Sequence, residues 1–212
     1  MEQPQENNPR IATFLPLKPG RSGKICGKTM DDGSCKYTVF LDQEVIMPDP
    51  YLELVHTIMN LRETDEMTIY LCSNGGWVET GIDIIHAIQN SKGQIITHAI
   101  GMCASIAAVI WCCGKVRKIS PMATLMFHMP SGGYFGKSMD VKDQTTGLCR
   151  YFTELLTRIT RGILTVEDIE NVVNHRKDVY LNGATVNERL ANLWKSCQRI
   201  MDFSGGIWEF SP

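Results

Sequence analysis

The middle of the chain alternates short apolar runs with longer segments in which apolar residues recur at helical spacing. The short runs are rich in β-branched, aromatic and aliphatic residues and predict strands over 37–41, 68–72, 95–100 and 124–127. The periodic segments present one apolar face and predict helices over 52–61, 77–90 and 105–113. Strands that alternate with helices are joined by right-handed crossovers, so we expect an α/β protein with a largely parallel sheet.

Turn signals on both sides of this region predict further elements. The segment 31–34 (Asp-Asp-Gly-Ser) is expected to close a small hairpin. A glycine-rich loop, 131–136, precedes a long helix, and 165–168 resembles a capping box that starts another. The broad apolar side of the long helix is typical of core packing or, on a projecting helix, of a subunit interface. That side consists of Leu148, Tyr151, Phe152, Leu155, Leu156 and Ile159.

One segment has the length of a membrane-spanning helix. No Lys, Arg, Asp or Glu occurs between Gly93 and Gly114, which is close to the roughly 20 residues that span a bilayer. We expect Gly101 to end a strand, however, and a short helix rich in small residues to begin at Ser105. A strand, a turn and a helix buried in the core account for this run better than a membrane span.

Composition narrows the class of protein. A chain of 212 residues supports one domain with a full core, and a net charge of −2 argues against nucleic-acid binding. The first residues are polar and show no signal peptide, so we expect a cytoplasmic protein, or one of an organellar matrix or stroma, or of a host cytoplasm if viral. The eight cysteines form no C-x-x-C pair, which disfavours zinc and indicates small core residues in a reducing compartment.

Three residues able to do chemistry occur in the order of a nucleophile, a base and an orienting acid. Ser105 lies at a predicted strand-to-helix turn, where a hydroxyl is exposed near a helix N-terminus. His128 ends a predicted strand, and Asp178 follows a basic cluster. Taken singly, these are typical of a capping serine, a hydrogen-bonded edge histidine and a surface ion pair. Together they predict a Ser-His-Asp hydrolase site.

Paired glycines upstream predict the remaining part of such a site. Gly75 and Gly76 directly follow the strand predicted at 68–72. We expect the backbone amides of Gly76 and Ile106 to bind an oxyanion, because glycine leaves room for a substrate carbonyl. An ordinary tight turn is the alternative. Glu79 is interpreted as the only carboxylate close to this turn.

These motifs resemble those of the proteolytic subunit of the Clp protease family. That family has a Ser-Pro-Gly-Gly turn, a Gly-x-x-Ala-Ser nucleophile, a His-Gln-Pro before a glycine-rich loop, and an Arg-Asp before a short aromatic segment. The corresponding segments here are 73–76, 101–105, 128–133 and 177–178, and the resemblance extends over roughly 37–186. Asn74 stands in place of the proline, Met129 in place of the glutamine, and bulky Trp77 lies beside the oxyanion turn. Tyr70 matches an aromatic residue that the family uses to dock its unfoldase.

The resemblance implies a fold and an assembly. The implied fold is a crotonase-like α/β spiral of β-β-α units with a projecting helical handle at about 134–163. The chain then comprises an N-terminal extension (1–36), a catalytic domain (37–186) and a divergent C-terminal tail (187–212). In the family, handles interdigitate to stack two heptameric rings around a closed chamber, and mixed rings occur. A separate AAA+ ATPase unfoldase uses the ATP, so no metal or cofactor is expected in this subunit.

The implied function is that of a serine endopeptidase that cleaves unfolded polypeptides through an acyl-enzyme on Ser105. The substrate is expected to add as a strand between two segments of the chain. The residues expected to bind it are Gly75, Trp77, Val78, Ser131 and Gly132. Two alternatives stay open: a non-catalytic structural subunit of a mixed Clp-type ring, and an acyl-coenzyme A enzyme of the same superfold. The second alternative needs an acidic catalytic residue beside the oxyanion amides.

Overall fold

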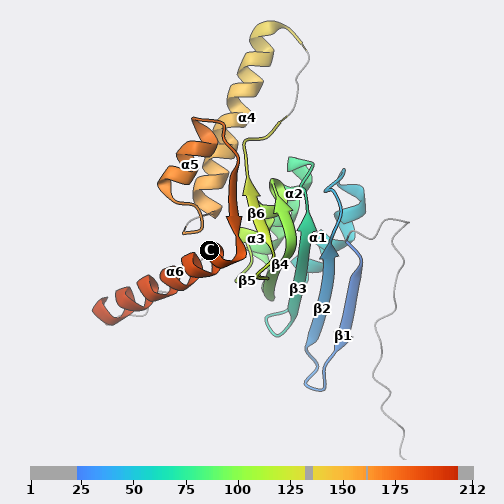
Figure 1. The fold of residues 1–212 in the computed structure, drawn as a ribbon. Helices are drawn as coiled ribbons and strands as arrows, with labels where there is room; N and C mark the ends of the chain where they lie inside the picture. Colours follow the sequence, from blue (N-terminus) through green and yellow to red (C-terminus); the bar gives the residue numbers. More distant parts are fainter. Residues whose placement is uncertain (1–22, 132–135, 161, 205–212) are drawn as a thin grey trace, which may run out of the picture.

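The computed structural model describes residues 23–131, 136–160 and 162–204, which form a mixed seven-stranded sheet with helices packed around it (Figure 1). The spatial order of the strands is β1-β2-β3-β4-β6-β7, and β5 pairs with β4 outside this path. The strands are β1 (Ile25–Thr29), β2 (Cys35–Leu41), β3 (Glu66–Ser73), β4 (Gln94–Ala104), β5 (Val116–Ile119), β6 (Thr124–Phe127) and β7 (Val179–Asn182). The helices are α1 (Leu52–Met59), α2 (Val78–Asn90), α3 (Ile106–Cys112), α4 (Ser138–Ile159), α5 (Val166–Val173) and α6 (Gly183–Ser204). A short 3-10 turn, Asp49–Tyr51, precedes α1.

The centre of the sheet is parallel, as the alternation of strands and helices predicts. β2, β3, β4 and β6 pair in parallel, and the antiparallel pairs are β1 with β2 and β6 with β7. The hairpin expected at 31–34 is confirmed, because it joins β1 to β2 and the amide of Met30 donates to the carbonyl of Ser34 at 2.8 Å. β1 therefore adds an edge strand from the segment that precedes residue 37.

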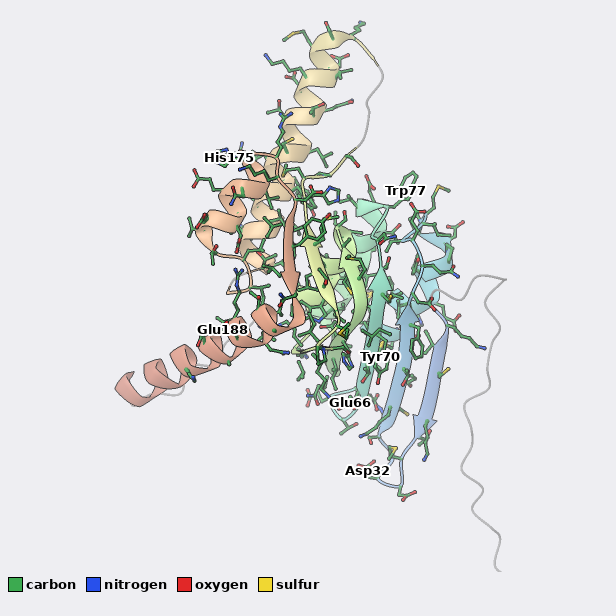
Figure 2. All side chains as sticks on the ribbon, viewed as in Figure 1. Asp32, Glu66, Tyr70, Trp77, His175 and Glu188 are labelled. Carbon is green, nitrogen blue, oxygen red and sulfur yellow. The ribbon has the colours of Figure 1, made fainter. Side chains whose placement is uncertain are left out.

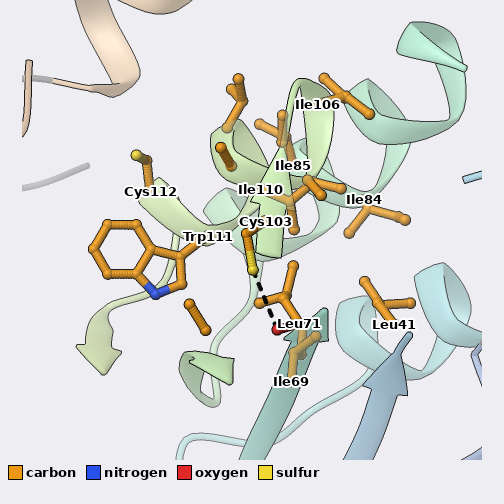
Figure 3. Close-up of a cluster of buried hydrophobic side chains, with 14 of the residues drawn as sticks. Leu41, Ile69, Leu71, Ile84, Ile85, Cys103, Ile106, Ile110, Trp111 and Cys112 are labelled. Atoms are coloured by element: carbon orange, nitrogen blue, oxygen red, sulfur yellow. Dashed lines mark hydrogen bonds between the residues drawn. The ribbon is translucent and has the colours of Figure 1, made fainter. Parts of the chain in front are cut away.

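The segment 93–114, which carries no Lys, Arg, Asp or Glu, forms strand β4 and helix α3 of the core. This confirms the interpretation of the segment as buried core elements in place of a membrane span. Trp111 on α3 is fully buried, and its indole N–H donates to the carbonyl of Lys118 at 2.8 Å. Cys103 on β4 is buried in the same cluster, and its thiol donates to the carbonyl of Leu71 at 3.2 Å (Figure 3). Burial raises the pKa of Cys103 and of Cys112 to about 12, so both behave as small apolar core residues. Within the described chain, no helix combines the length and the apolar character needed to cross a membrane.

The expectation that Gly101 ends a strand is wrong. β4 continues from Gln94 to Ala104 and changes partners on the way: its first part pairs with β5 and its last three residues pair with β6. The register with β3 shifts at the same place, which marks a bulge. A Cβ atom at Gly101 would lie 2.6 Å from the sulfur of Cys72. The glycine therefore permits the close approach that the bulge needs and does not terminate the strand.

The long helix divides into a core half and a projecting half. Phe152 and Leu156 are buried, and Leu155 and Ile159 pack against the core, so core packing is confirmed for the second half of α4. Tyr151, from the same predicted face, is 43% exposed. The first half of α4 extends beyond the rest of the molecule (Figure 1). The capping box before α5 is also confirmed, because Thr165 and Asp168 exchange side-chain and backbone hydrogen bonds.

A buried carboxylate links the turn end of the β1–β2 hairpin to the start of β3. Asp65 is 4% exposed and accepts hydrogen bonds from the backbone amides of Cys35 at 2.8 Å and Arg62 at 2.9 Å. The guanidinium of Arg62 adds a bond of 2.9 Å. The Arg62 side chain is the main cause that lowers the pKa of Asp65 from 3.8 to about 2. Because folding lowers this pKa, the stabilisation is complete above about pH 4 and is lost as the pH falls toward 2.

We expect Asp65→Asn to lower the free energy of unfolding at pH 7 by about 2 kcal/mol, because charge-assisted hydrogen bonds to buried amides are lost. Urea titrations at pH 7 and pH 3 measure the effect, and the difference from the unmodified chain should be smaller at pH 3. Glu66→Gln is the matched control, since its pair with Lys36 is 3.8 Å long and exposed and is worth under about 1 kcal/mol. Equal losses for the two variants would contradict the prediction.

Candidate active site

Ser105 occupies the junction of β4 and α3 in an unusual backbone conformation. Its φ is 57° and its ψ is −130°, and a non-glycine residue in such a region costs about 1–3 kcal/mol. Two sets of hydrogen bonds hold it there. Its amide donates to the carbonyl of Met126 on β6 at 2.8 Å, and its carbonyl accepts from the amide of Ala108 on α3 at 3.0 Å. The strand that leads to His128 therefore also fixes the backbone of Ser105.

The interpretation of Ser105 as a capping serine lacks its defining contact. Ser105 stands at the N-cap position of α3, but its side chain makes no capping hydrogen bond. A capping hydroxyl accepts a bond from the second or third amide of the helix. The hydroxyl of Ser105 is therefore available for another partner. Among the described residues, the other non-glycine with positive φ is Arg176, which lies shortly before Asp178, so both outliers belong to segments of the predicted triad.

The pairing of β6 with β7 brings His128 and Asp178 together. The last pair of this antiparallel ladder is Phe127 with Val179, and one further step places His128 opposite Asp178. Side chains of opposite residues lie on the same face of a sheet, with Cβ atoms about 5 Å apart. Both residues line a cavity of about 490 Å³ next to α4, together with Cys149 and Arg176.

His128 also lines the cavity that contains Ser105. This second cavity has a volume of about 410 Å³, and its lining residues are Glu44, Asn74, Gly75, Gly76, Ser105, His128 and Ser131. The imidazole is thus the group shared by the serine cavity and the aspartate cavity. No hydrogen bond joins Ser105 to His128, or His128 to Asp178, among those of the described residues. Such catalytic bonds are commonly long in a free enzyme and shorten when substrate is bound.

One side of the glycine turn after β3 is hydrogen-bonded to the segment that follows β2, and the backbone groups on its other side point away from that segment. The hydroxyl of Ser73 donates to the carbonyl of Gln43 at 2.5 Å and accepts from the amide of Gly75 at 3.1 Å. Val45 forms a parallel bridge with Gly76, through bonds from its amide to Gly75 and from Trp77 to its carbonyl. In a parallel pair, these bonds leave the N–H and C=O of the central residue directed to the opposite side. Gly76 therefore offers both groups away from Val45.

Gly75 brings this turn directly against the serine. A Cβ atom at Gly75 would lie 2.7 Å from the carbonyl oxygen of Ala104 and 2.7 Å from the Cβ of Ser105. The φ of Gly75 is 91°, a left-handed conformation that side chains disfavour. The amide of Ile106, the first residue of α3, lies 3.2 Å from the same point. First-turn amides have no partner within their helix, so the amide of Ile106 is left free close to Ser105, and Gly76 lines the same cavity as Ser105.

Some of the residues expected to bind substrate line the serine cavity and others do not. Gly75 and Ser131 line the serine cavity, whereas Trp77 and Val78 are not among its lining residues. Trp77 is 51% exposed at the N-cap of α2 and lies beyond the end of β3 (Figure 2). Val78 begins α2 and packs against the core. Gly132 lies outside the residues that the structure describes.

A row of rings crosses the sheet at Tyr70, away from the serine cavity. Phe40 and Tyr70 stack with ring centroids 5.0 Å apart, and Tyr70 and His98 are 5.3 Å apart. His98 also forms a hydrogen bond with the hydroxyl of Ser120 at 3.2 Å. Burial, followed by the charge of Lys118, lowers its pKa.

The interpretation of Glu79 as the only carboxylate near the glycine turn is wrong. Glu44 lines the serine cavity together with Gly75 and Gly76 and was not predicted from the sequence. Its position follows from the parallel pairing of β2 with β3, because the chain beyond Leu41 and Leu71 continues to the parallel bridge of Val45 with Gly76. Within the described residues, no three His, Cys, Asp or Glu side chains are grouped as metal ligands.

A comparison with known protein families identifies the chain. The model of the Clp protease family matches residues 29–188, which include the hairpin strand β2, the glycine turn, Ser105, His128 and Asp178. The match covers most of the chain and nearly all of the sheet. Membership in this family indicates peptidase activity, which agrees with the grouping of a serine, a histidine and paired glycines around one cavity. The chain therefore belongs to the Clp protease family.

Proposed function

We propose that this chain is the serine endopeptidase subunit of a self-compartmentalised Clp-type protease. Ser105 is the nucleophile, His128 is the general base and Asp178 orients and stabilises the imidazole. The observation that supports this most strongly is the backbone of Ser105, which is held at positive φ with an unbonded hydroxyl in the cavity that His128 lines. A residue that only capped a helix would gain nothing from this strained conformation.

The proposed reaction proceeds through an acyl-enzyme. The hydroxyl oxygen of Ser105 attacks the peptide carbonyl while its proton moves to His128. The amides of Gly76 and Ile106 stabilise the resulting oxyanion. His128 then donates the proton to the departing amine. A water molecule, deprotonated by His128, attacks the ester, and His128 returns this proton to the Ser105 oxygen as the acid product leaves. The carboxylate of Asp178 stabilises the imidazolium in each half of the reaction.

The same arrangement suggests how a polypeptide is held. The N–H and C=O groups of Gly76 face away from Val45, so an extended peptide can pair with this edge as an added strand. Ser131 lines the same cavity as the glycine turn and precedes Gly132 in the sequence. The two segments would therefore bind the substrate strand from opposite sides and place its carbonyl beside Ser105.

The proposal extends to fold and assembly. The parallel centre of the sheet and its packed helices suit a crotonase-like spiral, and the projecting half of α4 suits a handle between stacked rings. The row of Phe40, Tyr70 and His98 is a candidate surface for a AAA+ unfoldase, which would supply unfolded chains with the energy of ATP. The subunit itself would then need no cofactor.

A fluorophosphonate probe tests the proposal on the purified chain. We expect one adduct, located by peptide mass spectrometry on Ser105, because this reagent phosphonylates activated serines, with loss of fluoride. His128→Ala should abolish the adduct, since the base is lost, and heat-denatured protein should remain unlabelled. The sample is also sized by light scattering. An assembled ring without an adduct would refute the catalytic proposal in favour of the non-catalytic structural subunit.

A further inference from the structure

Glu44 is held beside the nucleophile by its neighbours on both sides along the chain. The preceding carbonyl, of Gln43, accepts from the hydroxyl of Ser73, and the following amide, of Val45, donates to Gly75 at 2.7 Å. The carbonyl of Glu44 itself accepts from the hydroxyl of buried Tyr51 at 3.2 Å. The backbone at this position is therefore part of the same framework as the glycine turn.

The side chain of Glu44 is directed to the open side of this framework. Val45 is 1% exposed and belongs to the core, whereas Glu44 is exposed and lines the serine cavity. Successive side chains of an extended segment point to opposite faces, so burying Val45 turns Glu44 away from the core. The carboxylate can then reach the space that a bound polypeptide would occupy.

The charge of this carboxylate is not balanced by the cavity. Glu44 is the one carboxylate among the seven residues that line it in the described structure, and no Lys or Arg is among them. The three ion pairs of the described residues, Lys36–Glu66, Arg62–Asp65 and Arg189–Asp168, do not involve Glu44. A cationic group would complement this site, and an anionic one would be repelled.

We propose that Glu44 is a specificity-determining residue that favours polypeptides with a lysine or arginine next to the bond to be cleaved. The inference rests on the proposed peptidase function and adds its substrate class. The cationic side chain would extend from the substrate strand toward Glu44 while the adjacent carbonyl lies at Ser105. Since the carboxylate is exposed, the preference is moderate and decreases with ionic strength.

Matched peptides test this inference. Each set carries lysine, norleucine or glutamate at one position, from two residues before to two residues after the cleaved bond, and kcat/KM is measured for each. We expect lysine to exceed norleucine by about tenfold at one position, and norleucine to exceed glutamate. The lysine preference should fall in about 1 M salt, where the Debye length is near 3 Å.

Two substitutions assign the preference to this carboxylate. Glu44→Gln should reduce the ratio of lysine to norleucine to about one, and Glu44→Lys should reverse the preference toward glutamate. Glu79→Gln is the matched control, because this carboxylate lies in the first turn of α2 and does not line the cavity. It should retain the preference of the unmodified chain.

Three results would overturn the inference. The first is equal hydrolysis of the lysine and norleucine peptides at every position by a chain whose Ser105 reacts with the fluorophosphonate probe. The second is an equal loss of kcat on all peptides in Glu44→Gln, which would indicate that Glu44 acts through His128. The third is a chain that neither reacts with the probe nor cleaves any peptide, and this result alone would also refute the proposed function.

Discussion

Replacing Ser105 with alanine is expected to reduce kcat on a fluorogenic peptide by about 10⁴-fold or more, because the only group that attacks the substrate carbonyl is removed. The unfolding temperature is expected to stay the same. The hydroxyl of Ser105 makes no capping bond, so its loss leaves the folded state with the same set of helix contacts. A large loss of activity without a loss of stability is the combination that distinguishes a nucleophile from a structural serine.

Thermal unfolding distinguishes a nucleophilic Ser105 from a Ser105 that only caps α3. Loss of a capping serine costs about 1 kcal/mol, which lowers the unfolding temperature of a chain of this size by about 2–4 °C. Ser138→Ala is the matched control, because Ser138 is the exposed first residue of α4 and is remote from both cavities. It should retain full activity. If Ser105→Ala were active but less stable, the catalytic assignment would fail.

Gly75→Ala is expected to reduce kcat/KM by at least about 10²-fold and to destabilise the chain. The new Cβ would lie 2.7 Å from the carbonyl oxygen of Ala104 and from the Cβ of Ser105, so the turn or the nucleophile must move. Displacing a reacting group by about 1 Å is sufficient for a loss of this size. The positive φ adds about 1–3 kcal/mol of backbone strain.

Gly33→Ala separates the effect of backbone strain from the effect of steric contact with Ser105. Gly33 has a φ of 79° at the exposed hairpin tip, and an added Cβ would meet no atom within 4 Å. This variant should therefore lose stability through strain alone and keep its activity. Peptide hydrolysis and urea unfolding, measured on both variants, compare the two sites. Equal activity of the two variants would show that the contact between Gly75 and Ser105 has no role in catalysis.

The sequence was sufficient to predict the elements that are governed by local periodicity. Apolar runs and helical spacing located β2, β3, β6 and α2 within two residues, and the order of Ser105, His128 and Asp178 pointed to a shared site. The parallel strand β5, beside β4, was not predicted. What sequence could not locate depends on pairing between distant segments. Gly101 has the local character of a strand breaker, yet two different neighbouring strands keep β4 extended through it. The approach of Glu44 to the glycine turn likewise follows from parallel pairing and not from proximity along the chain.

The antiparallel pairing of β6 and β7 makes the placement of His128 and Asp178 independent of the projecting half of α4. His128 and Asp178 are neighbours because the strands that end and begin beside them are paired, although the whole of α4 and α5 lies between them in sequence. Changes in the length of the outer part of α4 would leave the distance between the two residues unaltered. Insertions, deletions or a grafted peptide at the tip could therefore remodel the assembly while the catalytic geometry is inherited intact.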